Sequence, residues 1–167
     1  MTRPILAVDV DGVVSLFGFD EPPPAAEARY ELVDGNVHCI SLRAGERLRR
    51  LEEHFDMVWA TGWEDKANFY LPAMLGLAEL PHLTFDGAAR FGSAHWKLGP
   101  LDTYAHGRAL AWVDDSLDDS CYRWARDRDE PTLLVPTDPA LGLQEAETEA
   151  LIAWARGLAV EAGEQTP

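Results

Sequence analysis

Cysteine and long apolar runs are scarce in this sequence of 167 residues. Its two cysteines, Cys39 and Cys121, lie in separate segments and form no Cys-x-x-Cys or Cys/His spacing. The pattern therefore favours neither a disulfide framework nor a structural zinc site, and a reducing compartment is the default expectation. No run approaches the length of a membrane span, and the residues before Asp9 lack the pattern of a secretory signal peptide. We expect a soluble, cytoplasmic protein without a membrane partner.

Basic residues are also few, since 14 Lys and Arg stand against 29 Asp and Glu, for a net charge of −15. This excess of negative charge disfavours broad binding to nucleic acid or to anionic membranes. It does not exclude a local basic groove. Two arginine clusters could form one, but we expect both to lie on solvated helix faces, paired with nearby carboxylates. The clusters are Arg43, Arg47, Arg49 and Arg50, and Arg123, Arg126 and Arg128.

The remaining composition is that of a folded protein. Hydrophobic residues make up 47% of the chain and include six tryptophans, which argues against disorder and for a substantial core. The length suits one domain, and the sequence contains neither an internal repeat nor a linker long enough to divide it. We therefore expect a single domain over residues 1–167.

Apolar segments of strand character alternate with helical segments along the chain. Strands are expected over 5–10, 57–60, 109–113 and 132–135, with a short one over 83–85, and helices over 43–55, 64–75, 97–105, 117–128 and 144–158. Pro72 should kink or break the second helix. Asp34-Gly35-Asn36 predicts a hairpin between 29–33 and 37–42. The alternation predicts an α/β fold with a mainly parallel central sheet and helices on both faces.

The first expected strand ends in two carboxylates, Asp9 and Asp11, followed by Gly12, which permits a sharp turn. Side chains at i and i+2 share one face of a strand, so both carboxylates can converge on one point. One can attack or bind a metal while the other transfers a proton. A calcium loop would need a third oxygen ligand and a later Glu, but Val13 and Val14 follow instead. The motif therefore favours a catalytic site.

Two more expected strands end in groups that can take part in chemistry. Thr61 follows the strand over 57–60, and Asp114 and Asp115 follow the strand over 109–113. In a parallel sheet, ligands bind beyond the carboxyl ends of the strands. The sequence therefore predicts that these groups meet Asp9 and Asp11 at one edge of the sheet. Asp118, with its neighbour Asp119, instead fits the N-terminus of a helix, where the helix dipole favours negative charge.

These residues resemble the motifs of the haloacid dehalogenase (HAD) superfamily of Mg²⁺-dependent phosphohydrolases. The resemblance spans most of the chain, and the order of the motifs suits the family. In chain order, the four matching segments are Asp9-Val10-Asp11-Gly12-Val13, Val58-Trp59-Ala60-Thr61-Gly62, Lys97 and Ala111-Trp112-Val113-Asp114-Asp115.

The resemblance implies a Rossmann-like three-layer sandwich and a phosphomonoester hydrolase that works through an aspartyl-phosphate. Asp9 would be the nucleophile and Asp11 the general acid and base, while Thr61 and Lys97 would complete the catalytic group. Mg²⁺ would be held by Asp9, Asp114 and the backbone carbonyl of Asp11, with Asp115 orienting metal-bound water. The substrate-binding residues would be Thr61, Gly62, Trp63 and Lys97. Residues 13–42 offer room only for a minimal cap, with the hairpin as a flap.

A narrower likeness is to small HAD domains that are predicted to serve in RNA-repair systems. It implies a phosphorylated nucleic-acid end as the substrate, and a small-metabolite or nucleotide phosphatase is the alternative. The likeness rests on Thr61-Gly62-Trp63, Ala67-Asn68, Leu75-Gly76-Leu77, Trp112-Val113-Asp114-Asp115 and Gly142-Leu143.

Two readings of other classes remain open. A receiver-like phosphoacceptor domain also combines an acidic cluster with Thr and Lys on a parallel sheet. In a receiver, however, the nucleophile lies on the third strand, whereas the candidate here lies on the first. The other is a non-catalytic phosphate-binding module. The sequence gives no indication of the oligomeric state.

Overall fold

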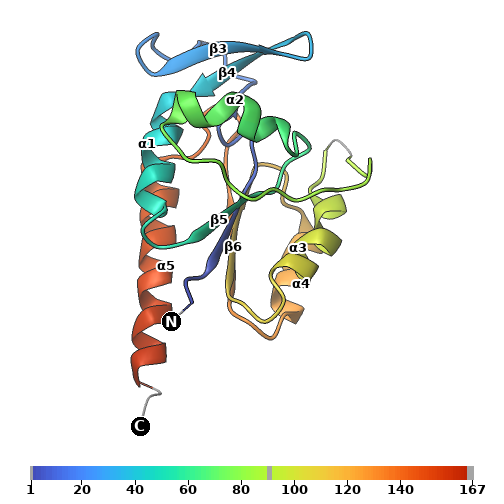
Figure 1. The fold of residues 1–167 in the computed structure, drawn as a ribbon, viewed down its shortest axis with the longest axis vertical. Coiled ribbons are helices and arrows are strands. Elements are labelled where there is room, and N and C mark those ends of the chain that lie inside the picture. The colour runs from blue at the N-terminus through green and yellow to red at the C-terminus, as the bar shows by residue number, and fades with distance from the viewer. Residues whose placement is uncertain (1, 90–91, 165–167) are drawn as a thin grey trace.

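The structure is a computed structural model that describes residues 2–89 and 92–164. It is a mixed α/β fold built on a four-stranded parallel sheet and a three-stranded antiparallel sheet (Figure 1). The strand order of the parallel sheet is β5-β1-β6-β7. Its strands are β1 (Ile5–Val8), β5 (Asp56–Trp59), β6 (Leu110–Asp114) and β7 (Thr132–Pro136). Since all of the pairings are parallel, the carboxyl ends of these strands meet at one edge.

Strand β1 lies in the middle of the parallel sheet and is buried on both faces. Its side chains alternate between two hydrophobic clusters, as the two-residue period of a strand requires. Leu6 and Val8 pack into one cluster, whereas Ile5 and Ala7 pack into the other. Strands covered on both sides are apolar throughout, which explains why polar residues begin only where β1 ends.

Helices cover both faces of the sheet (Figure 1). The first cluster includes buried residues of α1 (Leu42–Leu51), α2 (Lys66–Leu75) and α5 (Glu145–Glu164). The second includes those of α3 (Leu98–Tyr104) and α4 (Asp119–Asp127), and a 3₁₀ turn, η1 (His95–Lys97), precedes α3. The alternation of strands and helices predicted from the sequence is confirmed.

The antiparallel sheet has the order β2-β4-β3 and is built around the predicted hairpin. Its strands are β2 (Ser15–Leu16), β3 (Ala28–Val33) and β4 (Asn36–Ser41). The turn consists of Asp34 and Gly35, with φ values of 50° and 81°. Two positive φ values define the tight turn that an Asp-Gly pair favours between strands. Asn36, which was expected in the turn, already belongs to β4.

Three expectations about the bounds or existence of elements are wrong, and Pro72 does not break the second helix. Helix α1 ends at Leu51 rather than at residue 55. Helix α2 continues through Pro72 to Leu75, because the buried Leu71 and Leu75 hold the last turn in the core and the amides of Gly76 and Leu77 both donate to the Pro72 carbonyl. Within the described residues, the segment over 83–85 forms no strand, and an isolated bridge joins Trp59 to His82 instead. Helix α5 runs six residues beyond the expected 158.

No helix within residues 2–89 and 92–164 combines the length and apolar character needed to cross a membrane.

Candidate active site

Asp9 and Asp114 lie side by side at the carboxyl ends of the paired strands β1 and β6. Val8 pairs with Val113 in the register of β1 and β6, and the amide of Asp9 donates to the Val113 carbonyl at 3.1 Å. Asp9 and Asp114 are buried, and Asp115 follows half-buried at the same edge. Each of the three offers a carboxylate oxygen within 4.8 Å of the others. For Asp9, Asp114 and Asp115, the prediction that they meet at one edge of the sheet is therefore confirmed.

Lys97 lies between the two buried carboxylates. Its Nζ is 3.0 Å from Asp9 Oδ1 and 2.5 Å from Asp114 Oδ2. Burial alone would lower the pKa of Lys97, but the facing carboxylates of Asp9 and Asp114 outweigh it and raise this pKa above the ordinary value. The ammonium group therefore stays charged. Since Lys97 belongs to η1, it reaches the site from the side of the second hydrophobic cluster.

The pKa of the Asp9 carboxyl is raised by its surroundings. Burial raises the pKa of its carboxyl well above the ordinary value; Lys97 acts in the opposite direction, and Asp114 raises the pKa again. The pKa of Asp115 is also raised, first by its burial and then by Asp114. One ammonium thus faces several carboxylates, and the site carries an excess of negative charge.

This donor set fits a hard divalent cation. Mg²⁺ and related ions prefer carboxylate oxygens, and a bound cation would reverse the local effects that raise the pKa of these groups. The three side chains that could hold such an ion are Asp9, Asp114 and Asp115. The sequence analysis assigned Asp115 to metal-bound water rather than to direct ligation, and in the structure its carboxylate joins the same group. The side chain of Asp11 does not belong to it.

Gly12 allows Asp115 to approach the first loop. Its φ is +78°, and a Cβ at this position would lie 2.3 Å from Asp115 Cγ. Only glycine suits both the backbone conformation and this close approach. The Gly12 carbonyl also accepts a 2.8 Å hydrogen bond from Thr137 Oγ1, which fixes the loop to the end of β7. Gly12 therefore sets the position of Asp115 relative to β1.

Asp11 is held by residues from two other segments. Trp63 Nε1 donates to Asp11 Oδ2 at 3.1 Å, and His38 Nδ1 lies 3.7 Å from Asp11 Oδ1. His38 belongs to β4, and its Nδ1 also contacts Ser15 Oγ at 2.9 Å. His38 was not predicted from the sequence, because a lone histidine in a hairpin carries no motif. Only the pairing of β4 with β2, which begins four residues after Asp11, could have indicated it.

The segment after β5 contains Thr61, Gly62 and Trp63, and these three residues have different surroundings. Thr61 is fully buried, and its Oγ1 accepts from the Trp63 amide at 3.2 Å. Gly62 lines a cavity of about 570 Å³ together with Asp9, Asp11 and Lys97. Trp63 is 9% exposed, and its indole N–H points to Asp11. Of the expected substrate-binding residues, Gly62 and Lys97 line the cavity, whereas Trp63 supports Asp11.

Two aromatic side chains stand at the walls of this cavity. Phe17 follows β2 and is half exposed, while Trp96 is half-buried in η1 and meets the Phe85 ring edge-on, with centroids 4.7 Å apart. They give the otherwise acidic cavity an apolar border.

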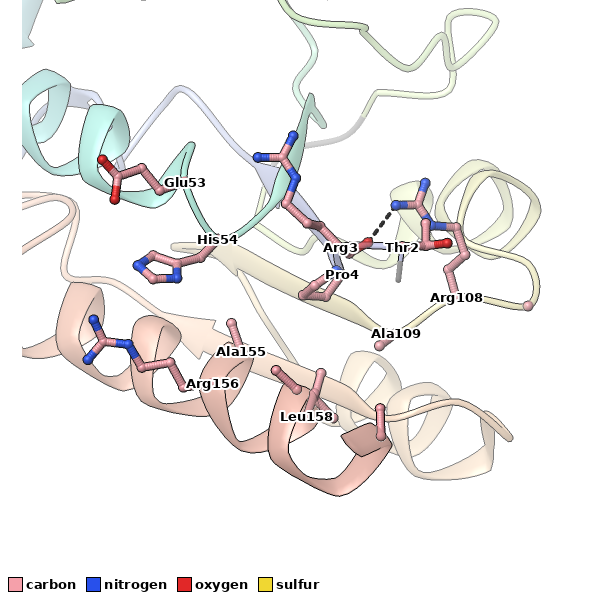
Figure 2. Close-up of a pocket in the computed structure, with 13 residues that line it drawn as sticks. Thr2, Arg3, Pro4, Glu53, His54, Arg108, Ala109, Ala155, Arg156 and Leu158 are labelled. Carbon is pink, nitrogen blue, oxygen red and sulfur yellow. Dashed lines mark hydrogen bonds between the residues drawn. The ribbon is translucent and has the colours of Figure 1, made fainter. Parts of the chain in front are cut away.

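A second hollow, of about 460 Å³, lies where the parallel strands begin (Figure 2). Pro4 and Ala109, just before β1 and β6, form one wall, and the second half of α5 forms the other. Arg3 and Arg108 lie beside it, but Asp56 pairs with both, at 2.9 Å and 2.6 Å. The carboxylate cluster lies at the opposite end of the strands, so this hollow is not the candidate active site.

Arg43 and Arg50 of the first arginine cluster behave as expected, whereas Arg128 of the second does not: its side chain is only 4% exposed and pairs with Asp102 and Glu130. Arg43 pairs with Glu27 and Glu46, and Arg50 pairs with Glu145 and Glu149. Asp118 caps α4, since its carboxylate accepts from the amides of Ser120 and Cys121. Hydrogen bonds from the side chains of Ser120 and Ser93 lower the pKa of Asp118 far below the ordinary value. Asp118 thus has a structural role, as the sequence predicted.

Comparison with known proteins leaves the family open. No family model matches the chain, and no curated protein matches it. Among solved structures, the chain is similar to a hypothetical protein of Xanthomonas campestris, with 14% sequence identity and a TM-score of 0.48. The match covers 99% of this chain and 90% of that chain. A likeness of this strength carries no functional argument, so the function is inferred from the site itself.

Proposed function

We propose that this chain is a Mg²⁺-dependent phosphomonoester hydrolase of the HAD type, which works through an aspartyl-phosphate on Asp9. The observation that carries the proposal is the position of Lys97 between Asp9 and Asp114 at the edge where β1 and β6 end. A nucleophile, a fixed positive charge and a set of metal-binding carboxylates are thereby within a few ångströms of one another. The cavity in front of them is large enough for a phosphate ester.

In the first step, Asp9 would attack phosphorus and form a new P–O bond, and the bond to the leaving group would break. Asp11, protonated at this stage, would give its proton to the leaving oxygen. In the second step, Asp11 would take a proton from the water that attacks the phosphorus, and the bond to Asp9 would break. Phosphate then leaves, and both carboxyl groups return to their starting state.

Lys97 has two tasks in this scheme. Its ammonium keeps the position of the Asp9 carboxylate fixed, and its charge opposes the negative charge that accumulates when a phosphate dianion approaches. The Thr61 hydroxyl, which is buried and accepts from the Trp63 amide, would donate its own proton to a phosphate oxygen. Mg²⁺ held by Asp9, Asp114 and Asp115, with the backbone carbonyl of Asp11, would supply the further positive charge that a dianionic substrate needs here.

The finer description of the fold belongs to the same proposal. We interpret the parallel sheet and its two helical layers as a Rossmann-like sandwich, and the β2-β4-β3 sheet as a minimal cap. Support for the cap comes from the hairpin itself, because His38 of β4 reaches Asp11 and Lys66 at the start of α2 pairs with Asp34 in the hairpin turn. The hairpin thus borders the site without enclosing it.

The proposal is tested by measuring phosphate release from an aryl phosphate with and without Mg²⁺. We expect release only with the metal, and none from the Asp9→Asn variant, because an amide is a poor nucleophile. A receiver-like domain would take up one phosphoryl group without turnover, and a binding module would release none. Either result would overturn the proposal.

The substrate is the narrower question. We propose a phosphorylated nucleic-acid end, supported by a site over which the described residues place no large cap, with a small-metabolite phosphatase as the alternative. Any affinity for nucleic acid must come from a local patch, and Arg43 and Arg50 are already paired with carboxylates. We therefore expect weak binding that falls steeply with salt. Comparing kcat/KM for a phosphorylated oligonucleotide and the matching mononucleotide at two salt concentrations decides between them.

A further inference from the structure

The carboxylate of Asp11 is held on one side by an indole and on the other by an imidazole. Trp63 Nε1 donates to Asp11 Oδ2 at 3.1 Å, whereas His38 Nδ1 stays 3.7 Å from Asp11 Oδ1. The side chain of Asp11 is 50% exposed, so half of its surface faces solvent. A carboxylate that is half in water would rotate freely without such contacts. The indole hydrogen bond fixes one oxygen and leaves the other to carry a proton.

The two supporting rings also hold each other. The rings of His38 and Trp63 meet edge-on, with centroids 4.7 Å apart and an angle of 69° between their planes. Ser15 Oγ contacts the same imidazole nitrogen that faces Asp11, which fixes the orientation of the His38 ring. Trp63 in turn packs edge-on against Tyr70 of α2. The support of Asp11 therefore joins the first loop, the hairpin and the start of α2.

We propose that Trp63 is a positioning residue for Asp11, that His38 supports it from the hairpin, and that neither residue binds the substrate. This inference rests on the proposed function, since it assigns the partners of its general acid. Trp63 selects which oxygen of Asp11 accepts a hydrogen bond and therefore which oxygen can face the leaving group. The hairpin contributes to catalysis through His38 without closing over the site.

The test uses two substrates that differ in their need for an acid. Because kcat/KM reports the steps up to cleavage of the ester bond, an alkyl phosphate should depend on proton donation by Asp11, whereas an aryl phosphate with an acidic leaving group should depend on it much less. We compare the wild-type protein with Trp63→Phe, which keeps an aromatic ring but loses the N–H donor together with the second ring of the indole, as the control variant below also does. Asp11 gains negative charge as it gives up its proton, and a hydrogen bond to a charged group corresponds to about a tenfold effect or more.

We expect Trp63→Phe to lower kcat/KM for the alkyl phosphate by about tenfold relative to the aryl phosphate. His38→Phe, which keeps a ring against Trp63, should shift the same ratio in the same direction by a smaller factor. The matched control is Trp124→Phe. Its indole donates to Asp102 at an equal 3.1 Å but lies outside the site, so the ratio should not change. Thermal unfolding of each variant checks that the fold is intact.

The double variant separates positioning from a general structural effect. Once Asp11→Asn has removed the acid, adding Trp63→Phe should change the rate no further, because the two residues act as a unit. Two results would overturn the inference and leave the proposed function in place. One is that Trp63→Phe lowers kcat/KM for the alkyl and the aryl phosphate by the same factor. The other is that Trp63→Phe still lowers the rate of the Asp11→Asn variant. A wild-type protein that releases phosphate from neither substrate would overturn the proposed function, and the inference would fail with it.

Discussion

Lys97 should stabilise the fold as well as the site. Replacing it by methionine keeps the length of the side chain and removes the ammonium that lies 3.0 Å from Asp9 and 2.5 Å from Asp114. Removing one partner of a buried ion pair costs about 3–5 kcal/mol, because the other partner stays buried and uncompensated. A loss of 1 kcal/mol lowers Tm by about 2–4 °C in a protein of this size. Lys97→Met should therefore lower Tm by about 6–20 °C in EDTA.

The matched control is Lys66→Met. Lys66 also pairs with an aspartate, Asp34, but both side chains are more than half exposed. Exposed pairs contribute only about 0–1 kcal/mol, so Tm should fall by less than about 4 °C. If both variants lost the same amount of stability, the argument that Lys97 compensates buried carboxylates would be refuted.

Mg²⁺ provides the second arm of this experiment. A cation that binds the same carboxylates should restore part of the stability of Lys97→Met, by about 2.7 kcal/mol at a concentration a hundred times the dissociation constant. Thermal unfolding across a Mg²⁺ titration measures the gain. A Lys66→Met protein that gained more than Lys97→Met would argue against a cation at Asp9 and Asp114.

Three other predictions concern single residues of the site and its surroundings. Asp114→Ala should raise the Mg²⁺ concentration for half-maximal activity, whereas an unchanged midpoint in a metal titration would exclude Asp114 as a ligand. Gly12→Ala should lower both Tm and activity, because the added Cβ would overlap with Asp115 and the φ of residue 12 is positive. A variant with the wild-type Tm and the wild-type kcat/KM would contradict this. Because the folded pKa of Asp118 lies below the ordinary 3.8, its contribution is complete above that pH and is lost as the pH falls below it. Urea unfolding at several acidic pH values should therefore show less acid sensitivity in Asp118→Asn than in the wild-type protein.

The parallel sheet and its acidic edge could be predicted because their signals are local in the sequence. Strand β1 is apolar on both faces, and the polar residues Asp9 and Asp114 stand where β1 and β6 end. The hairpin was predictable for the same reason, since Asp34 and Gly35 are residues that accept positive φ. In these cases the types of neighbouring residues are enough to predict the local backbone geometry.

The partners of Asp11 could not be predicted, because they depend on how distant segments pack. His38 comes close to Asp11 only since β4 pairs with β2, and Trp63 turns toward it only since α2 begins at Lys66. The course of α2 through Pro72 has the same origin: proline disfavours a helix interior locally, but the burial of Leu71 and Leu75 overrides this preference. Tertiary packing thus decided the points on which local patterns were silent or wrong.

The site draws its parts from both hydrophobic clusters, and this couples its geometry to the whole fold. Asp9 extends from the central strand, and Lys97 comes from η1, whose neighbours pack into the second cluster. Trp63 belongs to the first cluster, which also holds the base of the hairpin through Ile40. A change in the packing of either cluster therefore moves one part of the site relative to another. Since proton transfer and in-line attack both require placement within fractions of an ångström, core substitutions far from the cavity should lower activity before they unfold the protein.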